Sequence, residues 1–170
     1  IEYSERAGWP RFWLVDPLDG TKEFVNRNGE FTVNIAFVDN GAPVLGVVYV
    51  PVTGVCYLAV RGQGAWKETG GCDRQPIRVR TYRGGRATVV ASRSHRGDAV
   101  DKFLANLKAR EGEYDTASLG SSLKLCRVAE GAADVYPRLG PTSEWDTAAA
   151  QCVVESAGGR VTDLDGQPLR

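Results

Sequence analysis

The sequence predicts a layered α/β (α+β) fold, in which a β-rich first half is followed by alternating helices and strands. Short apolar runs bounded by Gly, Pro, Asn and Asp dominate the first half, as in strands joined by tight turns. In the second half apolar residues recur every three or four positions, which is the spacing of amphipathic helices. We therefore expect one region, 1–170, with a β-rich part at approximately 1–82 and an α/β part at 83–170.

Four apolar runs in the first part predict an antiparallel meander, because only turn-length segments separate the last three. The turn signals are Asp39-Asn40-Gly41 and the segment 51–54. Glycine-rich segments predict loops at 61–64 and 68–71. The predicted strands are 12–16, 31–38, 44–50 and 55–60, followed by two more at 77–81 and 87–91.

Three segments of the second part have helical periodicity. Apolar residues fall three or four apart in 98–110 and again in 121–130, where Gly131 ends the pattern. The third segment, 146–157, is rich in alanine and is closed by two glycines. Short strands at 133–136 and 161–164 complete the predicted elements.

Composition excludes several classes of partner. The chain has 21 Lys plus Arg and 21 Asp plus Glu, so no net field attracts nucleic acid or a membrane surface. No apolar run approaches the ~18 residues of a membrane span, so we expect no integral membrane association. The four cysteines show no CxxC pair, which favours reduced thiols in a cytoplasmic protein over a disulfide framework. An anionic ligand must therefore be bound by locally placed cations.

The ends of the chain suggest a longer parent protein. The sequence contains no methionine, even at position 1. It begins almost directly with a strand-like run and stops in the turn-like segment 166–170. We expect a chain that is cut at both ends.

The segment 13–21 (WLVDPLDGT) carries the strongest chemical signal. A buried strand ends in Asp16, and Asp19 follows three residues later. Two carboxylates on one turn repel each other unless a cation lies between them, and hard dications prefer oxygen ligands. Gly20 and Thr21 then offer backbone N–H groups and a hydroxyl to phosphate oxygens. The alternative is that this sequence forms only a stable turn.

A third carboxylate, Asp146, opens the alanine-rich helix. On its own it could be an N-cap, worth about 1 kcal/mol. The small residues after it would let the helix pack closely on the core and bring Asp146 to Asp16 and Asp19. We predict that these three side chains converge, although distant parts of the chain supply them, because a cation joins them.

These segments resemble a known family. WLVDPLDGT followed by WDTAAA is similar to the inositol monophosphatase superfamily of lithium-sensitive, magnesium-dependent phosphatases. DPLDGTKEF, NGEFTVNIA, GVVYVP, SRSH, GSSLK and AEGAADVYPR, in that order, resemble the CysQ-type 3′(2′),5′-bisphosphate nucleotidases. The resemblance extends over nearly the whole chain. It implies the sugar-phosphatase fold, with metal binding in the first part and substrate binding in the second.

The resemblance also implies a metal centre with two or three Mg²⁺ ions in the full-length enzyme. Asp16 would bridge two ions, the Leu18 carbonyl would bind one of them, and Asp19 and Asp146 would complete the other. Such a pair of ions would activate the attacking water and stabilise the leaving oxygen. Asp16 is accordingly both a catalytic and a metal-binding residue in this prediction.

The implied substrate contacts surround this centre. Gly20 and Thr21 would hold the scissile phosphate, and Thr21 would also orient the attacking water. A second phosphate needs cations of its own, and a guanidinium can bind a phosphate bidentately. His95 could instead be structural or solvated, and 120–122 a plain helix cap. The remaining predicted substrate-binding residues are His95, Ser121, Lys124, Arg138 and Asp146.

The implied reaction is hydrolysis of adenosine 3′,5′-bisphosphate (PAP) to AMP, and of the sulfate donor PAPS to APS, in sulfur assimilation. A cytoplasmic enzyme is implied, with peripheral contact to the inner membrane and a homodimer left open. Alternatives are an inositol or sugar phosphatase, or an inactive piece of the nucleotidase that only binds. The family's upstream metal-ligand glutamate does not match Glu2 or Glu5. We therefore expect this chain to act at least about 100-fold more slowly than a full-length enzyme.

Overall fold

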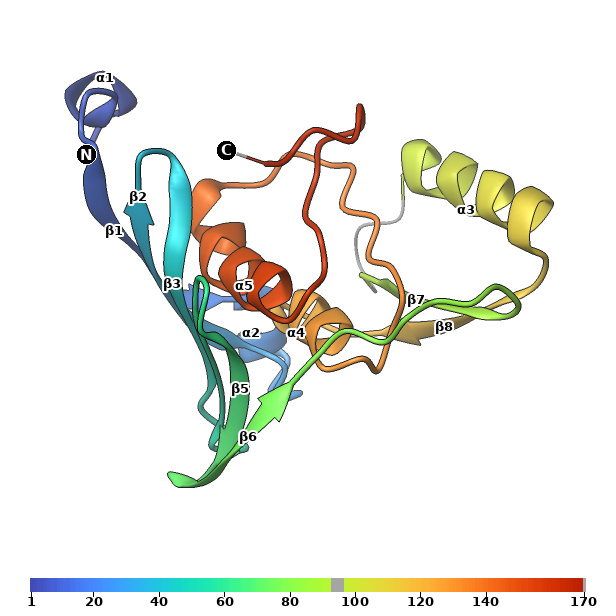
Figure 1. Cartoon of the computed structure of the whole chain (residues 1–170), viewed down its shortest axis with the longest axis horizontal. Helices are drawn as coiled ribbons and strands as arrows, with labels where there is room; N and C mark the ends of the chain where they lie inside the picture. The colour runs from blue at the N-terminus through green and yellow to red at the C-terminus, as the bar shows by residue number, and fades with distance from the viewer. Residues whose placement is uncertain (93–96, 170) are drawn as a thin grey trace.

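A computed structural model describes residues 1–92 and 97–169 of the chain. Figure 1 shows an antiparallel sheet on one side, two helices in the middle, and a smaller α/β unit on the other side. The predicted layered α/β fold is therefore confirmed. Two short helices, α1 (Tyr3–Arg6) and α2 (Thr21–Val25), lie before and after the first strand.

The sheet is a six-stranded meander in the order β1-β2-β3-β4-β5-β6, antiparallel throughout. The four-strand meander expected from the sequence is confirmed and is extended by two strands. Its strands are β1 (Arg11–Asp19), β2 (Thr32–Asp39), β3 (Ala42–Val50), β4 (Val55–Val60), β5 (Gly64–Thr69) and β6 (Cys72–Ile77).

Strand β5 occupies the segment between two predicted loops, and the strand predicted at 77–81 is wrong beyond its first residue. The sequence of β5, GAWKET, is too polar to show the alternation of apolar residues that predicts a strand. Its Lys67 forms an ion pair with Glu130 at 2.7 Å, and its Glu68 pairs with Arg74 of β6 at 3.3 Å. The ladder to β6 ends where Ile77 pairs with Ala65, so the segment after Ile77 leaves the sheet.

Helix α5 (Glu144–Ser156) packs on one face of this sheet, and α4 (Leu123–Ala129) packs against α5. The core beneath these helices contains many small residues, among them Ala36, Ala59 and Ala149. Gly46 of β3 allows the closest approach, because a Cβ built there would lie 2.2 Å from the Ala149 carbonyl oxygen. Small residues on both sides therefore bring α5 down onto the sheet, as its alanine-rich sequence predicts.

The smaller unit pairs β7 (Ala87–Ala91) in parallel with β8 (Tyr114–Ser118), connected by α3 (Asp98–Glu111). The strand at 87–91 and the helix at 98–110 are confirmed, whereas β8 was not predicted because its sequence, YDTAS, is mostly polar. The predicted strand at 133–136 is reduced to one bridge between Val135 and Val89. The strand predicted at 161–164 is likewise a single bridge, from Thr162 to Pro168.

Gly46→Ala tests the close packing of α5 on the sheet. We expect it to lower the free energy of unfolding by about 3 kcal/mol, because the added methyl group meets a backbone carbonyl that cannot move alone. Gly8→Ala is the matched control, since a Cβ there meets nothing within 4 Å. Equal stability of the two variants in denaturant titration would show that α5 does not approach β3 this closely.

Candidate metal and anion-binding site

Asp16 and Asp19 lie at the end of β1, where the strand is irregular. Asp16 pairs with Asn34 and Asp19 pairs with Thr32, so β1 has one residue more than β2 between these pairs. Side chains three residues apart on a regular strand point to opposite faces, and one extra residue returns them to the same face. The irregular register therefore aims both carboxylates at α5. The backbone N–H of Leu18 closes this segment by donating to Asp16 Oδ1 at 3.0 Å.

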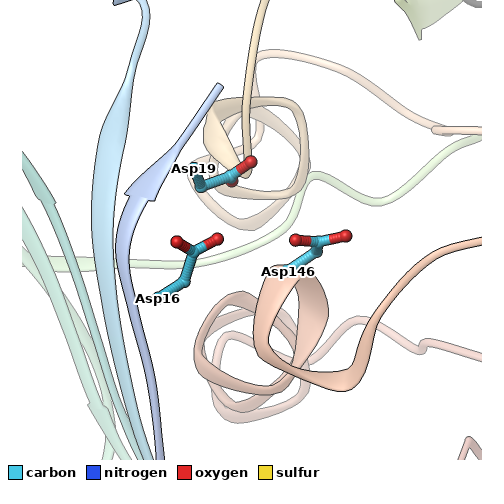
Figure 2. Close-up of side chains that lie close together, drawn as sticks. All are labelled: Asp16, Asp19 and Asp146. Carbon is cyan, nitrogen blue, oxygen red and sulfur yellow. The ribbon is translucent and has the colours of Figure 1, made fainter. Parts of the chain in front are cut away.

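Asp146 reaches the same place from the first turn of α5. It is not the N-cap, which was the alternative reading of its position. The cap is Ser143, whose backbone N–H donates to Asp146 Oδ2 at 3.1 Å. Ligand oxygens of Asp16, Asp19 and Asp146 lie within 4.8 Å of one another, and Figure 2 shows the three carboxylates facing a common space. The predicted convergence is confirmed.

The environment of these carboxylates favours a bound cation. The pKa of Asp16 is raised mainly by burial, and the charges of Asp19 and Asp146 raise it further. The hydrogen bond from the Leu18 N–H lowers it, but by less than burial raises it. The pKa of Asp19 is also raised, mainly by burial, although hydrogen bonds from Asn34 and Ser122 act in the opposite direction. Clustered carboxylate oxygens are the donor set that hard dications prefer. The site therefore fits a hard divalent cation.

Gly20 and the loop before α4 lie side by side next to the carboxylates. Gly20 has φ +88°, and a Cβ there would lie 3.2 Å from the Ser121 Cβ. A Cβ at Gly120 would lie 2.9 Å from the backbone carbonyl oxygen of Glu30, so the approach of these two segments also requires a glycine. Thr21 begins α2 directly after Gly20. The structure thus brings the two predicted anion-binding segments, 20–21 and 120–124, to one place.

A cleft of about 1220 Å³ opens at this point. Its wall includes residues from β1, α2, the loop before α4, α5 and the segment after residue 134. Its volume exceeds the usual ~300–1,000 Å³ of small-ligand sites. Seven of the predicted site residues line it: Asp19, Gly20, Thr21, Ser121, Lys124, Arg138 and Asp146.

Lys124 is the buried cation of this cleft, with 5% of its surface exposed. Its Nζ donates to the Ser121 carbonyl at 2.6 Å and lies 5.4 Å from the centre of the Tyr136 ring. Burial lowers the pKa of Lys124 to about 8, and the charge of Arg138 lowers it while that of Asp19 raises it. The charge of Lys124 therefore interacts both with Asp19 and with Arg138.

Arg138 is held at the cleft by its own loop. Its Nε donates to Thr142 Oγ1 at 2.6 Å and its Nη2 donates to the Pro141 carbonyl at 3.1 Å. These bonds fix the direction of a partly exposed guanidinium. The predicted ligand His95 lies outside the described residues, and the role of the Leu18 carbonyl stays a prediction.

The sequence analysis did not identify the polar residues beneath Asp19. Thr32 and Asn34 of β2, and Ser122 before α4, are almost completely buried. A signal was present, because Thr32 and Asn34 share the strand face of the buried Ala36 and Val38. Polar residues at core positions of a strand need hydrogen-bond partners. Both Thr32 and Asn34 have Asp19 as a partner.

Comparison with known proteins places this geometry in context. The model of the inositol monophosphatase family matches residues 3–170. The 3′(2′),5′-bisphosphate nucleotidase CysQ of Escherichia coli is 56% identical over 167 residues, which cover 98% of this chain and 65% of the relative. The chain therefore spans slightly less than two thirds of the length of this curated relative.

Solved structures give the same picture. The crystal structure of CysQ from Bacteroides thetaiotaomicron superposes with a TM-score of 0.85 at 47% identity, covering 93% of this chain and 63% of that one. An inositol monophosphatase from Anabaena gives a TM-score of 0.79 at 30% identity, covering 95% and 65%. In the described part of this chain, no helix is long and apolar enough to cross a membrane.

The pH dependence of stability tests the repulsion among the carboxylates. The carboxyl of Asp16 has a pKa of 3.8 in the unfolded chain and a higher pKa in the fold. Between these two pH values the unfolded chain has lost the carboxyl proton while the folded protein still holds it. The free energy of unfolding therefore falls as the pH rises through this range. Asp16→Asn removes that loss. Without divalent cations we expect the variant to be more stable than the wild type by about 1 kcal/mol at pH 7, with a smaller difference at pH 4.

With Mg²⁺ the wild type should become more stable than Asp16→Asn, because only the wild type gains stability from a bound ion. Asp101→Asn on the exposed face of α3 is the control and should show neither effect. Thermal unfolding with chelator and with Mg²⁺ at both pH values measures the difference. An Asp16→Asn variant less stable than the wild type in chelator at pH 7 would contradict the repulsion.

Proposed function

This chain belongs to the inositol monophosphatase family, and we propose that it acts on adenosine 3′,5′-bisphosphate, releasing phosphate and AMP with the help of Mg²⁺. The observation that carries this proposal is the convergence of Asp16, Asp19 and Asp146, of which Asp19 and Asp146 line a cleft that also contains Lys124. The substrate class is taken from the relative named 3′(2′),5′-bisphosphate nucleotidase, with which the chain shares 56% identity. PAPS is a second substrate of the same kind.

Asp16, Asp19, Asp146 and the Leu18 carbonyl are the proposed ligands of Mg²⁺. When bound, the metal supplies Lewis-acid stabilisation of phosphate oxygens and a water molecule of lowered pKa. Asp16 is the central ligand, because it is buried and its charge interacts with both other carboxylates. Its side chain is oriented by the Leu18 N–H, which occupies Oδ1.

The proposed position of the scissile phosphate is the junction of β1 and α2. The backbone N–H groups of Gly20 and Thr21 are the proposed donors to a phosphate oxygen there, and the hydroxyl of Thr21 orients the attacking water. Both residues line the cleft together with Asp146.

Lys124 and Arg138 would bind the second phosphate, with Ser121 beside them. The charge of Arg138 acts on Lys124, so the two cations lie in one region of the cleft. A bisphosphate carries about four negative charges, so its second phosphate needs cations other than the metal. His95 is proposed as a further ligand on the basis of the family resemblance alone. The division into a metal-binding part at 1–82 and a substrate-binding part at 83–170, a cytoplasmic location and a homodimer stay predictions.

An inositol or sugar phosphate is the second candidate substrate class. The structural likeness to the Anabaena inositol monophosphatase, at 30% identity, favours it. The two candidates differ in the need for a second anion site, which an inositol monophosphate does not require. Lys124 and Arg138 therefore favour the bisphosphate.

Phosphate release from adenosine 3′,5′-bisphosphate tests the reaction. We expect release with Mg²⁺, none with chelator, and at least about a 100-fold loss in Asp16→Asn, because the central ligand charge is gone. The E. coli relative serves as the positive control for the assay. Near-normal turnover by Asp16→Asn at saturating Mg²⁺ would contradict the proposal. Binding without turnover by the wild type would identify a chain that only binds the nucleotide.

Substrate preference tests the second anion site. Lys124→Ala and Arg138→Ala should each weaken the bisphosphate by about 10- to 100-fold, since a charged hydrogen bond is worth about 1.5–3 kcal/mol. Inositol 1-phosphate should be affected much less. Lys102→Ala, on the exposed face of α3, is the matched charge control. Equal losses on both substrates, measured as binding constants by calorimetry, would favour the inositol phosphatase reading.

A further inference from the structure

Three polar side chains are buried beneath the candidate metal site. Thr32, Asn34 and Ser122 have exposed fractions of 0%, 1% and 3%. Burying a polar group without a partner costs about 1–3 kcal/mol, and each of these residues could be apolar if packing were its only role. Every buried side-chain polar atom of the described residues has a partner.

All hydrogen bonds that the described residues make to the Asp19 carboxylate go to the same oxygen. Oδ2 accepts from the Ser122 backbone N–H at 2.6 Å, from Asn34 Nδ2 at 3.2 Å and from Thr32 Oγ1 at 3.3 Å. None of these residues donates to Oδ1. One oxygen of Asp19 is therefore fixed from below, and the other stays available to the space that it shares with the other two carboxylates.

The number of hydroxyl protons decides which of these contacts are hydrogen bonds at the same time. Thr32 and Ser122 have one hydroxyl proton each, yet their oxygens make three contacts: Thr32 to Asp19, Thr32 to Ser122 at 2.9 Å, and Ser122 to Asn34 Oδ1 at 2.8 Å. The two shorter contacts form a chain in which Thr32 donates to Ser122 and Ser122 donates to Asn34. The 3.3 Å contact of Thr32 with Asp19 is then secondary.

The Asp19 carboxylate, which can only accept, fixes the direction of the Asn34 amide. The NH₂ group of Asn34 must therefore face Asp19, and its oxygen accepts from Ser122. The opposite orientation would set the Asn34 amide oxygen against the Asp19 carboxylate oxygen, two acceptors without a proton between them. Asn34 is consequently the side chain whose donation to Asp19 is enforced by its surroundings.

We propose that Asn34 is a positioning residue, which holds Asp19 with Oδ1 turned towards the cation, and that Ser122 couples this orientation to the anion-binding loop. The inference rests on the proposed function, because it assumes that Asp19 is a metal ligand. Hydrogen-bonded partners behind a metal ligand commonly change metal affinity by about 10- to 100-fold when removed.

The coupling runs through the backbone of the loop before α4. Ser122 N–H bonds to Asp19, and Gly120 N–H donates to Glu30 Oε2 at 2.8 Å. Two carboxylates, Asp19 at the end of β1 and Glu30 before β2, thus hold the loop that leads into α4 and its Lys124. Because Lys124 Nζ bonds to the Ser121 carbonyl, the cation of the second anion site is positioned by the same loop.

Calorimetric titration of the chain with Mn²⁺ tests the proposal without any turnover. Asn34→Leu keeps most of the side-chain volume and removes the donor, and we expect it to weaken Mn²⁺ about 10- to 100-fold. Ser122→Ala keeps the backbone N–H but frees the amide of Asn34, and we expect a loss of about 3- to 10-fold. Thr32→Val removes only the first donor of the series of hydrogen bonds from Thr32 to Ser122 to Asn34, and it should have the smallest effect on Mn²⁺ affinity.

Tyr57→Phe is the matched control, because it removes a buried hydroxyl from the same sheet, where it bonds to Glu130 at 3.1 Å, away from Asp19. It should lower the melting temperature and leave Mn²⁺ affinity unchanged. A merely structural role of Asn34 would give the same pattern as this control. Unchanged affinity in a folded Asn34→Leu or Ser122→Ala variant would therefore overturn the proposal.

Hydrogen exchange separates this inference from the proposed function. In Asn34→Leu we expect faster exchange of the Ser122 amide, because Asp19 is no longer held beneath it. If the wild type bound no Mn²⁺ at all, the metal assignment of the proposed function would be wrong, and the proposal of a metal-positioning residue would fall with it. If the wild type binds and the Ser122 amide exchanges at the same rate in both proteins, the coupling through Ser122 is wrong although the metal site stands.

Discussion

The mutual repulsion of Asp16, Asp19 and Asp146 is the constraint on which the site depends. Their oxygens lie within 4.8 Å of one another, and burial raises the pKa of the first two. A fold does not bring like charges together without forces that hold them in place. The irregular register of β1 and the packing of α5 on the sheet supply these forces. A cation bound there would convert an unfavourable cluster into a binding site.

Each carboxylate is restrained by a donor that leaves part of it accessible. Leu18 N–H bonds to one oxygen of Asp16, Ser143 N–H to one oxygen of Asp146, and the donors around Asp19 share a single oxygen. The arrangement orients three negatively charged groups towards the same space in advance of the ligand. Preorganisation of this kind lowers the cost of ordering ligands when a hard cation binds. The small residues that let α5 approach β3 are therefore part of the site as well as of the core.

The sequence predicted those features that local patterns encode. Apolar runs gave the meander, periodicity gave α3, α4 and α5 to within a few residues, and isolated carboxylates in unusual settings identified the site. It failed where tertiary contacts replace local pattern. Polar β5 is a strand because Lys67 and Glu68 find partners, and β8 pairs with β7 despite its polar sequence. The role of Asn34 could not be predicted, because its donor, its acceptor and its burial come from three separate segments.

Diffraction from crystals soaked in Mn²⁺, recorded at a wavelength where manganese scatters anomalously, tests the central claim most directly. We expect an anomalous peak bounded by Asp16, Asp19 and Asp146, with metal–oxygen distances of about 2.0–2.3 Å and Asp19 binding through Oδ1. The same soak of an Asp146→Asn crystal should give a weaker peak or none. An empty space between the three carboxylates, or a peak elsewhere on the molecule only, would contradict the account.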